Sequence, residues 1–273
     1  MKSLALALGG GGARGLAHIA ALETLDEMGV TPVALAGTSI GAVFAAAYAA
    51  GMSGKAIHHY VVSLAKNHAE VIRRLIAARA RVLPNLFSGF STATLIDAEK
   101  FCAQFLPDAI PQNFEDLEIP LTVVASDLYG RREAVFSSGP LRPALAASIA
   151  LPGLMRPVRV NGRVLIDGGA TNPLPFEHLR GRADIVAAVD ISGTPPEDRT
   201  DVPNFWECLY TAVLVMGHAI TAEKLKRTQP DLLIQPNVGI FHVLDFYRAT
   251  AILRSAEPVK TEIEQRLGAL LGT

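Results

Sequence analysis

The first fifty residues contain the pattern that most constrains how this chain can fold. An uncharged segment of small apolar residues, Ser3 to Leu8, ends at a run of glycines, and a helical stretch from about Leu16 to Met28 follows. A second apolar segment, Val33 to Ala36, comes shortly after the expected helix stop at Gly29. A strand, a helix and a strand in so few residues predict a parallel pair joined by a right-handed crossover. Ligands of open α/β sheets bind at the carboxyl ends of such strands, so the loops there are candidate parts of a site.

A serine stands in the turn that follows the second strand. The segment from Gly37 to Gly41 leads into an alanine-rich helix from Ile40 to Ala50, and Ser39 lies at the bend. A sharp strand-to-helix turn projects the serine Oγ away from the backbone, and the two flanking glycines remove side chains that would crowd it. This is the local geometry of an acyl-transfer nucleophile, although short glycine and serine motifs also arise by chance in apolar sequences.

The glycine run allows more than one interpretation. Gly10-x-Gly12-x-x-Gly15 matches the dinucleotide-binding fingerprint, but that fingerprint needs an acidic residue at the end of the next strand, and none is present. The Gly-Lys-Ser/Thr of a Walker phosphate loop is absent as well, so we expect no nucleotide. Consecutive glycines at a helix N-terminus leave backbone N–H groups unshielded, which suits an oxyanion as well as a phosphate. The plainer interpretation is a tight turn, for which four glycines in a row are more than is needed.

Local sequence does not decide which residue is the base that would activate Ser39. Of the seven histidines, His178 fits best, because it follows Asp167 and preserves the Ser, Asp, His order of α/β-hydrolases. The competing candidate is Asp167 itself, which follows an apolar strand, Arg163 to Ile166, and precedes two glycines. We expect its carboxylate on an exposed turn with little around it, and an ordinary Asp-Gly turn residue is an equal alternative.

The rest of the chain alternates strands and helices. Further strands are expected at Ile119–Ser126, Ala134–Ser137, Arg163–Ile166, Ile185–Ile191 and Asp231–Gln235. Further helices are expected over 55–82, 97–105, 141–149, 206–225 and 247–271. This alternation predicts an α/β layered fold. Because the sequence shows neither an internal repeat nor a low-complexity linker, we expect a single domain over residues 1–273.

The composition excludes several classes of protein. The 273 residues carry 25 basic and 26 acidic side chains, for a formal net charge of -1, which gives no reason to expect a nucleic-acid partner. The two cysteines, Cys102 and Cys208, have no metal-ligand spacing around them, so we expect packed free thiols, no metal site and an intracellular protein. The few apolar residues between Lys2 and Gly9 are too short for a signal-peptide core, so a cytoplasmic location is expected.

Two segments raise the question of membrane contact. The chain is uncharged from Met28 to Gly54, long enough to cross a bilayer, but Pro32 and the glycine-rich turn at Ser39 would leave backbone groups unsatisfied in lipid. A buried strand, turn and helix explain this stretch better. The segment from Lys55 to Val82 alternates apolar and basic residues and would suit an amphipathic helix lying peripherally on the inner face of a membrane. A packed helix with a solvated basic face is the plainer alternative.

Five motifs in register extend the argument beyond local sequence. They are the run Gly9 to Gly15 with His18-Ile19, Gly37-Thr38-Ser39-Ile40-Gly41-Ala42, Ala125-Ser126-Asp127-Leu128, Ala147-Ser148-Ile149-Ala150-Leu151-Pro152-Gly153 and Asp167-Gly168-Gly169-Ala170-Thr171-Asn172-Pro173-Leu174-Pro175. In this order they resemble the patatin-like phospholipases, in particular the bacterial branch similar to the esterase domain of neuropathy target esterase. The likeness runs over nearly the whole chain, with a motif-bearing core at about 4–200 and the C-terminal strand and helices at about 205–271.

The resemblance implies a fold, an activity and a set of site residues. The fold is a three-layer α/β/α sandwich with a mostly parallel central sheet. The activity is that of a serine acyl hydrolase, a lipid esterase of the phospholipase or lysophospholipase type that acts on lipid or acyl-ester substrates without a cofactor. Ser39 is then the nucleophile and Asp167 the base of a dyad that has no histidine. The other site residues that the resemblance implies are the oxyanion donors Gly10, Gly11 and Gly12 with Arg14 beside them, supported by Gly15, Gly37, Gly41, Gly168 and Gly169.

The implied mechanism is a double displacement. Asp167 accepts the Ser39 proton while Oγ attacks an ester carbonyl, and a water activated by the same carboxylate later releases the fatty acid. A carboxylate is a weak base near neutral pH, so partial desolvation beside Val164, Leu165 and Leu151 is expected to raise its proton affinity. The alternative function is that of a regulatory or interaction protein with this fold and little hydrolase activity.

Overall fold

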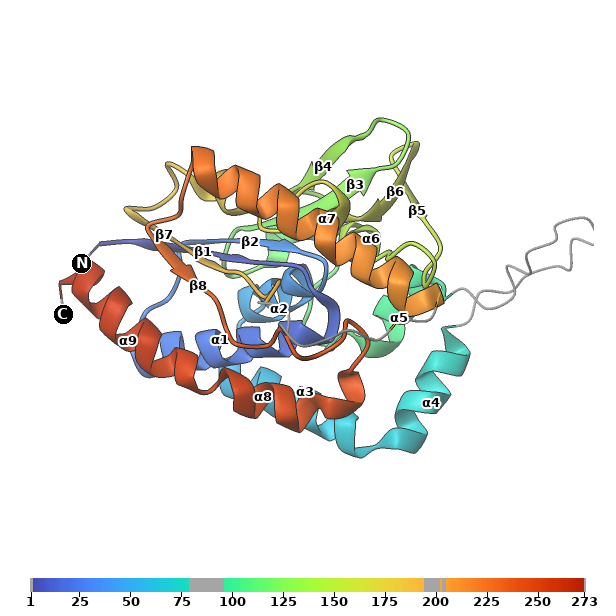
Figure 1. The fold of residues 1–273 in the computed structure, drawn as a ribbon, viewed down its shortest axis with the longest axis horizontal. Coiled ribbons are helices and arrows are strands. Elements are labelled where there is room, and N and C mark those ends of the chain that lie inside the picture. The colour runs from blue at the N-terminus through green and yellow to red at the C-terminus, as the bar shows by residue number, and fades with distance from the viewer. Residues whose placement is uncertain (1, 79–95, 194–201, 203–204, 273) are drawn as a thin grey trace, which may run out of the picture.

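A twisted β-sheet runs through the middle of the molecule, with helices on both of its faces (Figure 1). The computed structural model describes residues 2–78, 96–193, 202 and 205–272, and within these ranges eight strands form the sheet. Their order is β5-β6-β3-β2-β1-β7-β8, and β4 also pairs with β3. The strands are β1 Leu4–Leu8, β2 Ala34–Thr38, β3 Leu121–Asp127, β4 Arg132–Phe136, β5 Val158–Val160, β6 Arg163–Asp167, β7 Ile185–Val189 and β8 Leu232–Ile234. The five strands from β3 to β8 in this order run parallel, so the predicted mostly parallel sheet is confirmed.

The helices lie near the predicted positions. They are α1 His18–Glu27, α2 Ile40–Ala49, α3 Gly54–Lys66, α4 His68–Ala77, α5 Ala98–Phe105, α6 Leu141–Ser148, α7 Phe205–Arg227, α8 Ala249–Ala256 and α9 Pro258–Leu271. Short 3-10 turns are η1 Gly12–Ala17, η3 Phe114–Asp116, η4 Gly168–Ala170, η5 Phe176–Leu179 and η6 Phe246–Arg248. Gly29, with a φ of 66°, follows α1 as the predicted stop.

One prediction about the helices is wrong. The stretch 55–82 was expected to form one helix, but α3 and α4 are separate, and residues 79–82 lie outside the described part of the chain. The break is at Asn67, whose side chain accepts the Glu70 N–H at 3.1 Å and caps the start of α4. An asparagine that caps the backbone of a following turn favours a new helix over continuation of the old one.

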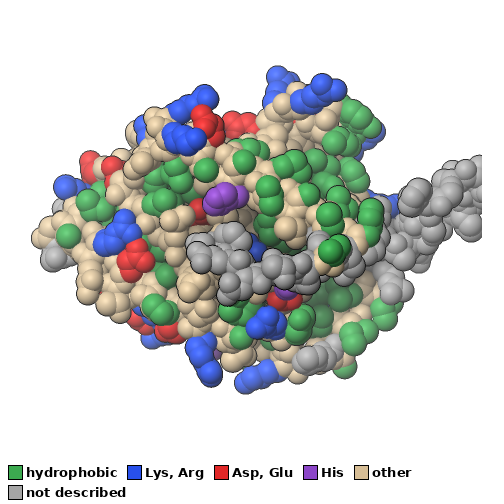
Figure 2. Space-filling view, viewed as in Figure 1, with side chains coloured by type: hydrophobic (Ala, Val, Ile, Leu, Met, Phe, Trp, Pro, Cys, Tyr) green, Lys and Arg blue, Asp and Glu red, His purple; other side chains and the backbone are tan. Residues whose placement is uncertain are grey.

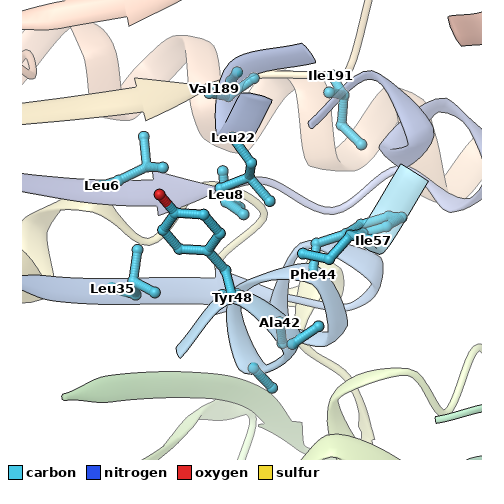
Figure 3. Close-up of a cluster of buried hydrophobic side chains, with 14 of the residues drawn as sticks. Leu6, Leu8, Leu22, Leu35, Ala42, Phe44, Tyr48, Ile57, Val189 and Ile191 are labelled. Carbon is cyan, nitrogen blue, oxygen red and sulfur yellow. The ribbon is translucent and has the colours of Figure 1, made fainter. Parts of the chain in front are cut away.

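The leucines of the first strands face the larger of two cores. Leu6 and Leu8 of β1 and Leu35 of β2 pack against Leu22 of α1 and Phe44 of α2 (Figure 3). The same core continues under α6, α8 and α9. Because successive side chains of a strand point to opposite faces of a sheet, the residues between these leucines must face the other side.

Those intervening residues are alanines, so the second face of the sheet carries only small side chains along its central strands. Ala5 and Ala7 of β1 belong to a separate buried cluster with Leu174 and with Phe176 of η5. Leu225 of α7 packs against the same cluster. Two cores on opposite faces of one sheet make three layers, so the predicted α/β/α sandwich is confirmed.

The pairing partners of β3 explain which loops meet. β4 pairs along β3 from Val123 to Asp127 and therefore occupies one edge of that strand. β2 and β6 share the other edge. β2 pairs as far as Val124, opposite Thr38, and β6 takes over at the next residue, with Asp167 opposite Ala125. The carboxyl ends of β2 and of the antiparallel β6 thus converge at one point on β3.

Candidate active site

Ser39 occupies a strained turn between β2 and α2. Its backbone has φ 55° and ψ -128°, and a positive φ is unusual for a residue with a side chain and concentrates at functional sites. A Cβ at Gly37 would lie 2.4 Å from Ala42 Cα, and one at Gly41 would lie 2.2 Å from the Leu8 carbonyl oxygen. Both glycines are therefore needed for α2 to begin so close to the strand ends.

The converging ends of β2 and β6 bring Ser39 and Asp167 into contact. Ser39 Oγ donates a hydrogen bond to Asp167 Oδ2 at 2.5 Å, in the short range of hydroxyl-to-carboxylate bonds. The other carboxylate oxygen, Oδ1, accepts the Gly169 N–H at 2.8 Å. A Cβ at Gly168 would lie 2.2 Å from the Val124 carbonyl oxygen, so this turn also requires a glycine.

Asp167 is buried, with 6% of its surface exposed, which corrects the expectation of an exposed turn. β6 pairs with β3 here, and the Asp167 N–H donates to the Ala150 carbonyl at 3.0 Å, so neighbouring segments cover the residue from two sides. Burial raises the pKa of Asp167 to about 6, although the hydrogen bonds from Ser39 and Gly169 act to lower it. A carboxylate with a pKa this close to neutrality accepts a proton more readily than an ordinary aspartate.

Two further serines hold this pair in place. Ser148 Oγ accepts the Ser39 N–H at 2.8 Å and donates to the Val124 carbonyl at 2.6 Å. Ser126 Oγ donates to the Asp167 carbonyl at 2.9 Å. Both serines belong to motifs of the resemblance, but sequence reasoning assigned them no role because their partners are distant in the chain. Their occurrence within those motifs was the available signal.

The glycine loop lies directly against Ser39. A Cβ at Gly10 would be 3.2 Å from Ser39 Cβ. The Gly10 N–H donates to the Pro173 carbonyl at 2.9 Å, so in this conformation it is engaged within the protein. Within the described residues, the N–H groups of Gly11 and Gly12 have no acceptor, and both residues line the cavity beside Ser39. Two of the three implied donors are therefore available.

Two buried side chains support this loop from behind. His18 Nε2 donates to the Gly9 carbonyl at 2.8 Å, and burial lowers the pKa of His18 to about 4, so the ring is neutral near pH 7. Arg14 donates through Nε to the Phe241 carbonyl at 2.7 Å and through Nη1 to the Ser192 carbonyl. Burial lowers the pKa of Arg14, although Asp245 acts to raise it. Arg14 thus joins the start of η1 to two other segments rather than pointing at Ser39.

His178, the alternative base, belongs to a different polar cluster. Its Nε2 lies 3.0 Å from Glu133 Oε2 and 3.5 Å from Asn172 Nδ2, and among the described residues Ser39 is not one of its hydrogen-bond partners. Burial alone would raise the pKa of Glu133, but hydrogen bonds from Asn172 and His178 lower it. Glu133, Glu177 and His178 lie close enough to share a cation, yet the Lys224 ammonium already binds Glu177 Oε1 at 2.7 Å. This cluster therefore ties α7 to the segment that follows Asp167.

An apolar cavity of about 570 Å³ extends from Ser39. Asp167 and the glycine loop form its polar end, and side chains from α2, α3, α4, α5 and α7 line the rest, among them Phe44, Ile57, Leu75, Phe105 and Leu214. Its volume lies within the range of about 300–1,000 Å³ that is typical of small-molecule sites. In the described part of the chain, no helix has the length and apolar character needed to cross a membrane.

Comparisons with known proteins place this geometry in a family. The family model of the patatin-like phospholipases matches residues 6–180. An uncharacterized NTE family protein of Mycobacterium tuberculosis is 38% identical over 192 residues, which cover 70% of this chain and 49% of that protein. Patatin-like phospholipase domain-containing protein 7 of Rattus norvegicus is 30% identical over 211 residues, which cover 76% of this chain and 15% of that protein. The chain thus spans about half the length of the mycobacterial relative and a smaller share of the rat protein.

A solved structure agrees at the level of the fold. VipD from Legionella pneumophila superimposes with a TM-score of 0.51 and 15% identity, over 96% of this chain and 67% of that one. At this identity the likeness concerns architecture alone. The family model and the sequence relatives carry the assignment. The chain belongs to the patatin-like phospholipase family, a family of carboxylic ester hydrolases.

Proposed function

We propose that this protein is a serine acyl hydrolase that cleaves lipid esters with Ser39 as nucleophile and Asp167 as base. The observation that carries the proposal is the 2.5 Å hydrogen bond from Ser39 Oγ, on a strained turn, to the buried Asp167 carboxylate. A nucleophile in direct contact with its base, at the end of an apolar cavity, is the arrangement that acyl transfer needs. Family membership supports the same reaction class.

In the proposed mechanism, the Ser39 hydroxyl proton moves to Asp167 along the hydrogen bond between them. Asp167 takes the Ser39 proton as Oγ forms a bond to the ester carbonyl carbon, and the resulting carboxylic acid then protonates the departing alcohol. In the second half, the carboxylate removes a proton from water, hydroxide attacks the acyl-enzyme, and Ser39 regains its proton as the fatty acid leaves. A pKa of about 6 suits both halves, because Asp167 is ionised at neutral pH but holds a proton well enough to return it.

The carbonyl oxygen gains negative charge during attack, and the glycine loop supplies donors for it. Gly11 and Gly12 line the cavity, and among the described residues no acceptor binds their N–H groups. They also stand at the start of η1, which continues into α1, where the helix dipole favours a negative charge. The Gly10 N–H acts instead as an anchor, because it holds the loop to the Pro173 carbonyl.

The cavity suggests the kind of substrate. Its lining is almost wholly apolar beyond the Ser39 end, so it fits an acyl chain with the ester group at the polar end. We therefore propose a lipid esterase of the phospholipase or lysophospholipase type, built as one patatin-like domain over residues 1–273. Among the described lining residues of α2, α3, α4 and α5, none is charged, so nothing there favours a charged headgroup.

The test is hydrolysis of a chromogenic acyl ester, followed by a panel of lipids. Ser39→Ala and Asp167→Asn are each expected to abolish hydrolysis while the variants stay folded. His178→Ala is the matched control, and it should keep most of the activity. Loss of activity in folded His178→Ala would contradict the dyad and favour a triad. A wild-type protein that a fluorophosphonate probe fails to label at Ser39 would instead favour the regulatory alternative.

A further inference from the structure

Exposed apolar side chains occur on three of the elements that line the cavity. They come from three separate elements: Ile72 and Ile76 of α4, Val215 and Met216 of α7, and Tyr247 of η6. Each is more than half exposed, and Tyr247 reaches 77%. Ile72 and Tyr247 also line the cavity, so the exposed surface and the cavity lining are continuous. We call these five residues the apolar rim.

The helix α7 is the most unusual part of the rim, because both of its sides are mostly apolar. Its inner side lines the cavity with Tyr210, Val213 and Leu214, and the exposed His218 is a polar residue of the same lining. Its outer side is uncharged, and the exposed residues there are Cys208, Thr211, Ala212, Val215, Met216 and Ala219. The sequence from Cys208 to Ala222 contains no Asp, Glu, Lys or Arg. A helix with one face in water normally carries charges on that face, so this one is suited to an apolar partner.

The arrangement is visible on the molecular surface. Figure 1 shows α7 lying across one face of the molecule. On the same face, Figure 2 shows hydrophobic side chains gathered over α7, while most acidic and basic side chains lie toward the periphery. At the end of α7, Lys224 binds the polar cluster around Glu177 and Asn172. Lys226 and Arg227 pair with Glu223 on the same last turns of the helix.

We propose that the apolar rim docks on the surface of a lipid bilayer and inserts its side chains among the lipids. This inference rests on the proposed function, because a lipid ester is the substrate that resides in such a surface. The continuity of rim and cavity supports a bilayer over other partners: an acyl chain can pass from the membrane to Ser39 along apolar side chains without crossing water.

The charges beside the rim indicate how the contact is made. On α4, Glu70 binds both Arg73, at 2.6 Å, and Arg74, at 2.7 Å, so the basic side chains are already paired within the helix. Arg74 also donates to the Gln104 carbonyl at 2.7 Å. Docking therefore depends on apolar insertion rather than on attraction to anionic headgroups, and it should respond little to salt.

The experiment compares binding of the full chain to vesicles of pure phosphatidylcholine. Three variants, Val215→Asp, Met216→Asp and Ile76→Asp, place a charge on the rim at residues that do not line the cavity. Each should weaken vesicle binding by about tenfold or more, since burying an unpaired charge opposes insertion. Hydrolysis of a water-soluble short-chain ester should stay unchanged, whereas hydrolysis of an ester embedded in vesicles should fall. Val33→Asp is the control, because Val33 is 45% exposed at the opposite end of β2 from Ser39.

Several results would overturn the inference. Wild-type protein that does not bind neutral vesicles, rim variants that bind like wild type, or binding that requires anionic lipid and is abolished by salt would each do so. So would a dimer that rim variants dissociate, without vesicle binding, because the rim would then join two copies of the chain. Ser39→Ala separates the two proposals: it should bind vesicles like wild type while inactive. Rim-dependent binding by a wild-type protein that hydrolyses no ester would support docking and contradict the proposed function.

Discussion

The Ser39 end of the sheet and the wall of the cavity are held together by different kinds of contact. At the sheet end, backbone atoms approach so closely that only glycine fits at Gly37, Gly41 and Gly168, and hydrogen bonds fix Ser39 and Asp167. The cavity wall consists of apolar side chains, several of them half-exposed, with few directional contacts. A single added atom can disrupt the close backbone packing at the sheet end, whereas a cavity wall of apolar side chains tolerates exchange of one apolar residue for another. Under the proposed function, the reaction would depend on the first region and the choice of acyl chain on the second.

The largest expected effect tests the rigidity of the sheet end. Gly41→Ala would place a Cβ 2.2 Å from the Leu8 carbonyl oxygen and 2.5 Å from that of Gly9, both backbone atoms. We expect a loss of unfolding free energy of about 3 kcal/mol or more and no measurable esterase activity. Gly29→Ala is the control: its Cβ would meet nothing within 4 Å, so only its φ of 66° costs energy, about 1–2 kcal/mol. Equal effects of the two variants in thermal unfolding would contradict the close-approach argument.

The second prediction separates stability from activity at the same site. The folded pKa of Asp167, about 6, lies above its ordinary value of 3.8, so ionisation destabilises the folded state. This loss of unfolding free energy is absent below about pH 4 and grows between pH 4 and 6. Above about pH 6 it is complete, on the order of 2–3 kcal/mol. Asp167→Asn should therefore be inactive yet more stable than wild type at pH 7 in urea unfolding. At pH 4 the two proteins should have equal unfolding free energies. If Asp167→Asn is less stable than wild type at pH 7, ionisation of the buried Asp167 carboxylate does not destabilise the folded state.

The third prediction concerns the pH dependence of the rate. If Asp167 is the base, as we propose, only its ionised form accepts the Ser39 proton. The value of kcat/KM should then fall as pH drops through about 6 and be roughly tenfold below its plateau at pH 5. Initial rates on a short-chain ester, with folding checked at each pH by circular dichroism, measure this. A profile that stays flat down to pH 4 would show that another group is the base.

The smallest expected effect tests the tolerance of the wall. Leu75 lines the cavity and is half-buried, whereas Ile76, its neighbour on α4, does not line it. Leu75→Ala should reduce kcat/KM for long-chain esters by roughly threefold to tenfold and leave acetyl esters unaffected, because only long chains reach it. Ile76→Ala should change neither in a series of water-soluble esters. If Leu75→Ala lowered kcat/KM for long-chain and acetyl esters equally, the cavity wall would be as intolerant of substitution as the sheet end.

The two regions also differ in how far the sequence predicts them. Strand, glycine turn and helix from Leu4 to Ala49 were predicted closely, because each boundary there is marked by a glycine or a change in periodicity. Local sequence offers Asp167 as one of two candidate partners for Ser39, beside His178, and the family resemblance selects it. The contact between Ser39 and Asp167 joins residues 128 positions apart, and the cause is that β2 and β6 share one edge of β3, which no local pattern encodes.

The errors have the same origin. Asp167 was placed on an exposed turn because Asp-Gly usually marks one, but β3 and the Ala150 segment cover it. The resemblance implies Gly10, Gly11 and Gly12 as oxyanion donors alike, and only the fold shows that the Gly10 N–H binds the Pro173 carbonyl. Local sequence predicts which chemical groups stand at a turn. Whether such a group is buried, or whether its N–H is already hydrogen-bonded, depends on distant segments that only the fold brings near.

The alanines on the second face of the sheet have a consequence for the glycine loop. Because Ala7 and its neighbours are small, Leu174 packs down onto the strands. The carbonyl of the preceding residue, Pro173, accepts the Gly10 N–H. We therefore expect a bulkier residue at Ala7, which is fully buried, to displace Leu174 and with it the Pro173 carbonyl. The glycine loop beside Ser39 would then move although neither Ser39 nor Asp167 is altered.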